Sequence, residues 1–568
     1  MTDGSGSTNV LHPVVTSGQW IGPPERPLMS WLTAPVGRVG RVGRVGVVIV
    51  PPAGYEYWSA HRTLRTLAER LAQQGCLALR FDYDGTGDSA GDQWDSARLE
   101  AWGDGVAHAA TTLRQWGVTT LVVIGLRIGG SFALMQGDAV DADAVVAWVP
   151  VVRGRRYVRE LQLLGLAVPE NSGSPEWSGG VVQAGSVFST ETLAELGAVD
   201  LASLPDRPAP KVLIVDRDDK PASTALLDRL RALGVEPDHL VLGGMDQVLD
   251  RPTEYATAAD DMIDGICRWV GPGDVSDSPA PAPAPAPVAS QLPVKATFDW
   301  KGGSVHEEVT RLGVDGLVGI LTRPLGSSRG TVVFLNSGSE HHVGPGRAWV
   351  EYARDLAGTG FTSLRVDFSG WGESPDRGHA PGRPYDQHGI DEVREVVDAL
   401  RGRDHRRIVL AGLCAGAWIA LRAALDVDVE GVVAINPQLY WQPGDPVEAD
   451  IVSETRVRRQ PEILRNKRMR SLGVWSLLDI LGVRDPAAVW LRALEARRVP
   501  TLAVFAEGDD GIEFLRDRVG RAWRRALRSG LTSTVVVKGI DHPMHRHWER
   551  PAMVSAIAAW LEVTLPTE

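Results

Sequence analysis

The sequence predicts two successive α/β domains, each built on a mostly parallel sheet that helices cover on both faces. Short apolar β runs alternate with amphipathic helical patterns, which is typical of βαβ units. The chain has 568 residues, and a single core rarely grows beyond about 250–300 residues, so two domains are expected. An alternating Pro-Ala tract near the middle separates two stretches of similar length. Such a tract cannot build a core and acts as an extended spacer.

The predicted domain boundaries follow from the Pro-Ala tract. The first domain covers residues 1–272, the linker covers residues 273–293, and the second domain covers residues 294–568. Within the second domain, residues 438–499 lie between two β runs and are expected to form a helical cap over the cleft. Because the linker is short, we expect the two domains to pack as an internal pseudo-dimer.

The two halves carry the same succession of motifs. In each half one β run ends in Arg-x-Asp-x-x-Gly-x-Gly-x-Ser, from Arg80 to Ser89 and from Arg365 to Ser374. A later β run enters a tight Gly turn, which reads GLRIGG in the first half and GLCAGA in the second. The halves then continue with LIVDRDD and GMDQ, or with AVFAEGDD and GIDH. This order indicates a tandem repeat of one domain.

A strand that runs into Gly-x-nucleophile-x-Gly and then into a helix is the nucleophile elbow of the α/β-hydrolase fold. In the second half the motif is Gly412-Leu413-Cys414-Ala415-Gly416. The sharp turn strains the central residue and leaves room only for glycine beside it. The motif therefore predicts that Cys414 is a nucleophile. The alternative is a small buried apolar residue, which is the usual state of a free cysteine and our interpretation of Cys76 and Cys267.

The partners of a nucleophile follow it in the order that this fold requires, an acid and then a histidine. The acid comes directly after an apolar β run, where Asp509 and Asp510 are both candidates. His542 follows the last β run. We expect Asp509 to orient the imidazole of His542, and His542 to activate Cys414 for attack on a carbonyl carbon.

Two backbone N–H groups are expected to hold the oxyanion, that of Ala415 and one from Ser337 or Gly338. His341 and His342 flank this loop and Trp371 maps near the cleft, so all three are candidate substrate contacts. Apart from a contact of that kind, we interpret the remaining histidines of these loops as solvated: His341, His342, His545 and His547.

A basic cluster lies within the predicted cap. Its cations are Arg456, Arg458, Arg459, Arg465, Lys467, Arg468 and Arg470, with only Glu462 opposing them. Arginine suits phosphate geometry, so Arg465, Lys467 and Arg468 are candidates for binding coenzyme A or a phosphopantetheine arm on a carrier protein. A solvated helix face explains the cluster equally well.

The first half lacks the residues that catalysis needs. Its elbow reads Gly125-Leu126-Arg127-Ile128-Gly129, and Gln247 stands where the histidine belongs. Arginine is no nucleophile and glutamine is no general base, so the first half is predicted to be a pseudo-enzyme. We expect Arg127 to pair with Asp218 or Asp219 and thereby close the vestigial site.

These motifs resemble a known family over nearly the whole chain. The second half resembles the hydrolases found with exosortase A systems, in the group with a Gly-Leu-Cys elbow, through SGSEHHVGPGR, LRVDFSGWGES, GLCAGA, GDDGIEF and IDH. The first half resembles the companion group with a Gly-Leu-Arg elbow, through PPAGYEYW, FDYDGTGDS, GLRIGG and VVRGRRYVREL. More distantly, the second half is similar to polyester synthases and dienelactone hydrolases. That similarity implies acyl transfer or hydrolysis through a thioester.

Composition argues against several other classes of protein. A formal net charge of −12 is unusual for a nucleic-acid-binding protein. No stretch approaches the ~20 apolar residues of a membrane helix, and the N-terminus lacks a secretory signal pattern. Three cysteines cannot form a disulfide framework, so we expect a cytoplasmic protein. No metal or cofactor is expected, because neither metal-ligand spacing nor a phosphate-binding Gly loop occurs.

The expected function is that of a cysteine-nucleophile α/β-hydrolase that acts on acyl thioesters or esters, either as a thioesterase or as an acyltransferase. The alternative is a non-catalytic scaffold in which both halves serve as binding modules. Retention of Cys414, Asp509 and His542 in one half favours the enzyme.

Overall fold

The computed structural model of the chain describes residues 12–36, 45–167, 180–220, 224–251, 253, 256–272, 293–338, 340–378, 384–441 and 485–566. The chain divides into two compact units, and the boundary lies between Asp299 and Trp300. Residues 273–292 of the predicted linker and residues 442–484 of the predicted cap lie outside the described residues. None of the helices within the described ranges is long and apolar enough to cross a membrane.

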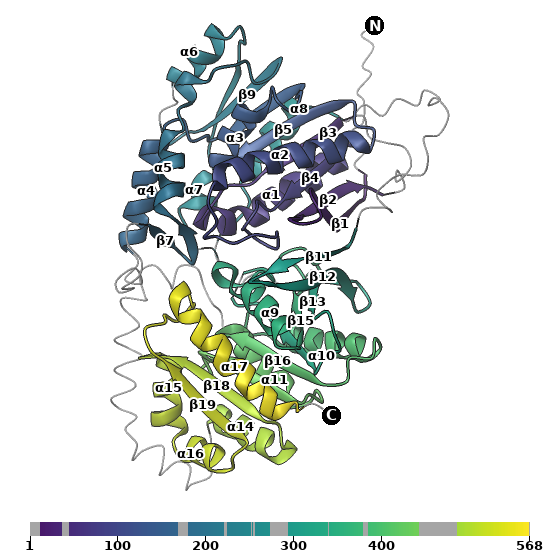
Figure 1. The fold of residues 1–568 in the computed structure, drawn as a ribbon, viewed down its shortest axis with the longest axis vertical. Helices are drawn as coiled ribbons and strands as arrows, with labels where there is room; N and C mark the ends of the chain where they lie inside the picture. The colour runs from purple at the N-terminus through teal and green to yellow at the C-terminus, as the bar shows by residue number, and fades with distance from the viewer. Residues whose placement is uncertain are drawn as a thin grey trace, which may run out of the picture. The chain divides into compact units, whose positions relative to one another are not determined.

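The first unit contains an eight-stranded sheet (Figure 1). Its strand order is β1-β2-β4-β3-β5-β6-β9-β10, in which β2 runs antiparallel to both of its neighbours and the following pairs are parallel. A small antiparallel hairpin, β7 and β8, stands apart from this sheet. The strands are β1 (Val14–Ile21), β2 (Leu28–Pro35), β3 (Val45–Val50), β4 (Leu77–Phe81), β5 (Thr120–Leu126), β6 (Ala144–Trp148), β7 (Val181–Gln183), β8 (Ser186–Phe188), β9 (Lys211–Arg217) and β10 (Asp238–Leu242).

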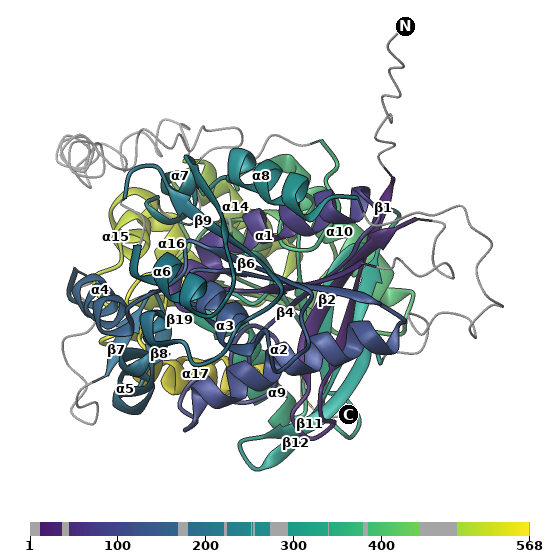
Figure 2. The same cartoon turned by 90° about the horizontal axis from the view of Figure 1, so that it is seen from above.

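Helices cover both faces of the first sheet. Figure 2 shows α1 and α8 on one side of the strands, and α2 and α3 on the other. Each face has its own apolar core, because side chains of successive strand residues point to opposite faces. The helices are α1 (Tyr55–Gln73), α2 (Arg98–Gln115), α3 (Ile128–Gln136), α4 (Gly154–Ala167), α5 (Thr190–Ala198), α6 (Thr224–Ala232), α7 (Met245–Leu249) and α8 (Asp260–Val270).

The second sheet has nine strands in the order β11-β12-β13-β15-β14-β16-β17-β18-β19, of which β11 spans the boundary and the other eight lie in the second unit. Strand β13 runs antiparallel to β12 and β15, and the pairs from β15 onward are parallel. The strands are β11 (Lys295–Trp300), β12 (Gly303–Leu312), β13 (Leu317–Arg323), β14 (Thr331–Phe334), β15 (Thr362–Val366), β16 (Ile408–Leu413), β17 (Gly431–Ile435), β18 (Thr501–Ala506) and β19 (Thr532–Val537).

Helices also cover both faces of the second sheet. One apolar core is formed with α9 and α17, and the core on the other face with α10, α11, α14, α15 and α16. Helix α14 is the described part of the predicted cap that is helical. The helices are α9 (Ala348–Gly358), α10 (Gln387–Arg401), α11 (Ala415–Ala423), α14 (Pro486–Arg497), α15 (Asp510–Phe514), α16 (Arg521–Arg528) and α17 (Arg550–Thr564).

The two sheets share one topology. Without its first strand, the second sheet repeats the strand order and the strand directions of the first. The predicted fold class, two successive α/β domains with mostly parallel sheets and flanking helices, is confirmed.

The repeated Arg-x-Asp-x-x-Gly-x-Gly-x-Ser motif has the same structural role in both units. The Ser89 hydroxyl donates to the backbone oxygen of Asp82 over 2.7 Å, and the Ser374 hydroxyl donates to that of Asp367 over 2.6 Å. Each hydroxyl also accepts an N–H from the neighbouring antiparallel strand. The motif therefore fixes the loop after the strand and requires no catalytic explanation.

Candidate functional site

The predicted elbow joins β16 to α11 in the second unit. Cys414 has φ 55° and ψ −111°, a conformation that is uncommon for residues other than glycine. Its N–H donates to the backbone oxygen of Ile435 over 2.9 Å. A Cβ atom on Gly412 would lie 2.2 Å from the backbone of Gly416, and one on Gly416 would lie 2.6 Å from the oxygen of Asn336. Only glycine fits at either position, as the motif predicts.

A buried carboxylate contacts His542. Asp509 caps α15, where its Oδ1 accepts the N–H of Gly511 over 2.8 Å, and its Oδ2 lies 2.5 Å from Nδ1 of His542. The neighbouring Asp510 is exposed, whereas Asp509 is buried. Of the two candidate acids, Asp509 is the one in contact with the imidazole.

The surroundings of His542 favour its protonated form. Burial opposes the charge, but the hydrogen bond with Asp509 and the interaction with Cys414 outweigh it, and they raise the pKa of His542 to about 10. Its Nε2 is buried and makes no hydrogen bond with the described residues. Cys414 is thus close enough to affect the pKa of His542, while the geometry of the two side chains falls short of a hydrogen bond. Catalytic hydrogen bonds are often loose before substrate binds.

The predicted oxyanion donors lie around one cleft. Ala415 is the first residue of α11, so its N–H has no acceptor within the helix. Gly338 has φ 56° and follows Ser337, which is buried. Both Ala415 and Gly338 line the cleft, together with Trp371 and other residues. The cleft therefore opens beside the elbow, on the side of the expected oxyanion.

Aromatic side chains lie next to Cys414. The Tyr385 hydroxyl is 3.6 Å from Sγ of Cys414 and donates to Oε1 of Gln438 over 3.0 Å. Its ring stacks on Trp441 at 5.3 Å and meets Trp418 edge-on at 5.7 Å. Sequence reasoning missed Tyr385, because it precedes α10 without any motif and reaches the nucleophile only through the fold.

The interpretation of the loop histidines as solvated is wrong. His341, His342 and His547 are buried, and His545 is half-buried. His342 packs against Asp367, whose Oδ2 lies 2.6 Å from its Nδ1 and whose Oδ1 accepts its backbone N–H over 2.6 Å. Burial opposes ionisation of Asp367, but His342 and backbone N–H groups outweigh it and lower the pKa of this carboxyl. Charge pairing therefore explains the burial of His342 and Asp367.

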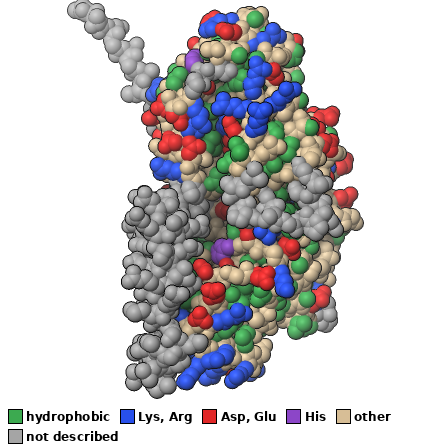
Figure 3. All heavy atoms as spheres, turned by 90° about the vertical axis from the view of Figure 1, so that its left-hand side faces the viewer, with side chains coloured by type: hydrophobic (Ala, Val, Ile, Leu, Met, Phe, Trp, Pro, Cys, Tyr) green, Lys and Arg blue, Asp and Glu red, His purple; other side chains and the backbone are tan. Residues whose placement is uncertain are grey.

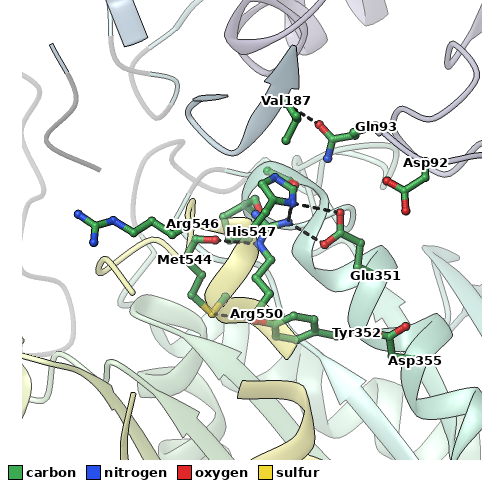
Figure 4. Close-up of polar contacts among 12 residues, drawn as sticks. Asp92, Gln93, Val187, Glu351, Tyr352, Asp355, Met544, Arg546, His547 and Arg550 are labelled. Atoms are coloured by element: carbon green, nitrogen blue, oxygen red, sulfur yellow. Dashed lines mark hydrogen bonds and ion pairs between the residues drawn. The ribbon is translucent and has the colours of Figure 1, made fainter. Parts of the chain in front are cut away.

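The buried side chain of Arg550 holds the loop after His542. Figure 4 shows the Arg550 guanidinium between Glu351 and the backbone of Met544. Arg550 donates to Glu351 over 2.8 Å and to the oxygen of Met544 over 2.9 Å. It also donates to backbone oxygens of Pro345 and Gly346, near the predicted oxyanion loop. One side chain thus ties together two of the loops that carry candidate site residues.

The predicted phosphate-binding residues Arg465, Lys467 and Arg468 lie outside the described residues. Among the described residues, α16 presents exposed cations at Arg521, Arg524, Arg525 and Arg528. Figure 3 shows Lys and Arg side chains gathered at the lower end of one face, the end at which Figure 1 has α16. No group of three or more His, Cys, Asp or Glu side chains in the described part of the chain has a metal-binding arrangement.

The first unit has the same elbow with a different side chain. Arg127 has φ 56° and ψ −119°, and its N–H donates to the oxygen of Trp148 over 2.9 Å. Its guanidinium bonds Glu56 of α1 at 2.7 Å and Glu160 of α4 at 3.2 Å, and lies over the ring of Tyr157.

The expected pairing of Arg127 with Asp218 or Asp219 is wrong. Asp219 is bonded by Arg217, at 2.7 and 2.6 Å, and Arg217 also bonds Asp250. Arg217 therefore pairs with the loop that corresponds to the Asp509 loop. Arg127 pairs instead with carboxylates of helices α1 and α4. Gln247 takes part in α7 and accepts a hydrogen bond from the hydroxyl of Thr257 over 3.2 Å.

The cysteines outside the elbow are core residues. Cys76 and Cys267 are buried in the first unit, as their interpretation predicted, while Cys414 is partly exposed. Burial raises the pKa of Cys267 to about 12, which makes it a poor nucleophile.

Comparison with known proteins agrees with the topology of the second unit. Residues 332–566 match the model of the alpha/beta hydrolase family. No curated protein matches the chain in sequence.

Several solved structures are similar to part of the chain. One is Est1E from Butyrivibrio proteoclasticus with bound ferulic acid, at 19% identity and a TM-score of 0.34, over 44% of this chain and 97% of that one. Another is XC6422 from Xanthomonas campestris, described as an a/b serine hydrolase without lid, at 18% identity and a TM-score of 0.29, over 46% of this chain and 97% of that one. A third is the esterase PF2001 of Pyrococcus furiosus, at 15% identity and a TM-score of 0.33, over 46% of this chain and 91% of that one. The family match is the stronger finding: the second half of this chain carries an alpha/beta hydrolase family domain.

Proposed function

We propose that the second half is a cysteine-dependent enzyme that transfers the acyl group of an ester or thioester to water or to a second substrate. The observation that carries the proposal is the convergence of Cys414 with the His542–Asp509 pair. The three residues follow three parallel strands, and such strand ends are where ligands bind in open α/β sheets.

Each residue would have a distinct role. The Cys414 thiolate attacks the carbonyl carbon and forms a C–S bond, while the carbonyl electrons move to oxygen. The N–H of Ala415 and one from Ser337 or Gly338 stabilise that oxyanion. The intermediate then collapses and breaks the bond to the leaving oxygen or sulfur, which receives the proton of His542.

The second half-reaction regenerates the enzyme. Water, an alcohol or an amine attacks the acyl-enzyme carbonyl and gives its proton to His542. Collapse of this intermediate breaks the C–S bond and returns Cys414 to the thiolate. Asp509 holds the imidazole ring and stabilises its protonated form, which gives up its proton in the first half-reaction and is restored in the second.

The cleft beside the elbow is the proposed binding site for the acyl group. Trp371, Phe368 and Ile419 line one part of it, which suits an apolar acyl group next to the oxyanion donors, and polar side chains such as Asp386 and Glu392 line another part. His341 belongs to the loop after Gly338 and is proposed to shape this site. Arg465, Lys467 and Arg468 are proposed to bind the phosphates of coenzyme A or of a carrier-protein arm.

The first half is proposed to be a pseudo-enzyme. Arg127 replaces the nucleophile and is neutralised by Glu56 and Glu160, so the first half alone fits the scaffold alternative. We also propose, from the matching motifs, that the halves correspond to the two groups of exosortase A-associated hydrolases.

Intact-protein mass spectrometry after incubation with a panel of acyl thioesters and esters tests the proposal. We expect a covalent acyl adduct whose peptide contains Cys414, and we expect Cys414→Ala to lose both adduct and turnover. Cys267→Ala is the matched control and should keep both. A Cys414→Ala protein with wild-type turnover would contradict the mechanism.

A further inference from the structure

One buried amide side chain touches both loops that carry the acid and the histidine. Asn436 directly follows β17 and is 0% exposed. Its Oδ1 accepts the N–H of Ala506 over 2.7 Å, and its Nδ2 donates to the backbone oxygen of His542 over 2.8 Å. Its own N–H donates to the oxygen of Val504 over 2.8 Å. Asn436 thus connects the end of β18 with the loop that follows β19.

The position of these contacts matters for the acid–imidazole pair. Ala506 ends β18, three residues before Asp509, and the oxygen of His542 belongs to the histidine itself. The amide therefore holds the main chain on both sides of the contact between Asp509 and His542. Because one end of an amide accepts and the other donates, asparagine satisfies both groups at once.

The backbone at this position restricts the choice further. Asn436 has φ 43°, in the left-handed region that asparagine enters more readily than most residues. A shorter polar residue such as serine could not span the two groups, and aspartate could only accept.

The first unit provides the comparison. Val149 occupies the equivalent place after β6, with φ 46° and an N–H that donates to Val215 over 2.7 Å. The fold therefore imposes the same bend in both units, at a non-glycine residue each time. The amide occurs in the unit that has a histidine at position 542, and it is missing where Gln247 replaces that histidine.

We propose that Asn436 is a positioning residue, which holds His542 in line with Asp509 and Cys414. The inference rests on the proposed function in one respect, that His542 keeps Cys414 in its reactive thiolate form. Two measurements separate the proposals: the titration of the His542 ring, which needs no substrate, and the alkylation of Cys414 by iodoacetamide.

The variant to examine is Asn436→Val in the full chain, with Asn436→Leu as an uncharged second variant of similar size to asparagine. The ring titration is followed by NMR of ¹³C-labelled histidine, with the signal assigned by its loss in His542→Gln. In the wild type we expect a midpoint near 10. In Asn436→Val we expect it to fall toward the free value of about 6.5, because the bond with Asp509 loosens. Asp541, the other carboxylate next to His542, contacts Arg546 and His545 and remains unchanged.

We expect the alkylation of Cys414 at pH 7 to slow by about 10–100-fold in Asn436→Val, the size typical of lost supporting contacts. The matched control is Thr322→Val, which removes a buried hydrogen bond to Glu307 away from the cleft. It should lower stability and leave both the His542 midpoint and the alkylation rate unchanged. If Asn436→Val fails to fold, Asn436→Leu decides, because it removes both side-chain hydrogen bonds and adds no charge near the imidazole.

The outcomes are distinct. An unchanged His542 midpoint in the folded variants would overturn the positioning role, whatever the activity. A lowered midpoint together with a Cys414 that alkylates no faster than Cys267 in the wild type would support the positioning role and contradict the proposed nucleophile.

Discussion

The elbows of the two units have nearly the same backbone and present different side chains, a thiol in one and a guanidinium in the other. Cys414 and Arg127 differ by 1° in φ and 8° in ψ, from 55° and −111° to 56° and −119°. Each donates its N–H to the neighbouring strand over 2.9 Å, and each is flanked by glycines that have no room for a Cβ. The comparison teaches that the strand order and the glycines dictate the elbow, independently of the side chain that the elbow presents.

Three positions outside the elbow also differ between the two units. In the first unit Gln247 replaces His542, and Val149 replaces Asn436. Pro52 stands where the second unit has Ser337, as the contacts of Gly129 and Gly416 align the two loops. Proline has no N–H, so it cannot donate to an oxyanion. The residues of the proposed chemistry are therefore distributed over several loops, whereas the backbone geometry of the elbow is local.

The largest effect on turnover is expected from replacing the acid, Asp509. Asp509→Asn should lower kcat by about 10⁴-fold, because the amide favours the wrong tautomer of His542. Asp510→Asn, one residue along the chain and exposed, should stay within about twofold of the wild type. Steady-state kinetics on whichever ester or thioester acylates Cys414 gives both values, and equal losses in the two variants would contradict the assignment of Asp509.

A smaller effect is expected for the first unit. Arg127→Met should destabilise it by about 3 kcal/mol, because the substitution leaves the carboxylate of Glu56 poorly solvated and without its cation. Turnover should not change. Hydrogen-exchange mass spectrometry localises the loss, which should be confined to peptides of the first unit. Loss of turnover at unchanged stability would mean that Arg127 takes part in the chemistry.

The smallest effect is the pH dependence of stability from His542. Its pKa in the folded protein is about 10, above the ordinary 6.5, so folding favours the protonated ring. The contribution is therefore fully present below about pH 6.5 and is lost as the pH rises through about 10. The difference in unfolding free energy between wild type and His542→Gln, measured at pH 6, 8 and 10, should shrink steadily. A difference that grows with pH would show that burial outweighs the contact with Asp509.

Much of the fold and part of the site could be predicted because the signals are local. The elbow needs only glycines at fixed spacing, and the order of Cys414, Asp509 and His542 follows the order of the strands. The partners of Arg127 could not be predicted, because Glu56 and Glu160 belong to helices that approach the elbow only in the folded chain. Buried His342 was missed for the same reason, since its partner Asp367 is 25 residues away. Asn436 had a signal that was not used: VVAINP and VVAWVP differ at that residue.

The strained conformation of Arg127 has a practical consequence for protein engineering. Holding a non-glycine residue in such a region costs about 1–3 kcal/mol, and the first unit, proposed to be a pseudo-enzyme, bears this cost at Arg127. The first unit is therefore a starting point for enzyme design. A thiol or hydroxyl introduced at position 127 would already have the backbone conformation that an elbow requires. What such a design must supply lies elsewhere, in a base at 247, an amide at 149 and an N–H donor at 52.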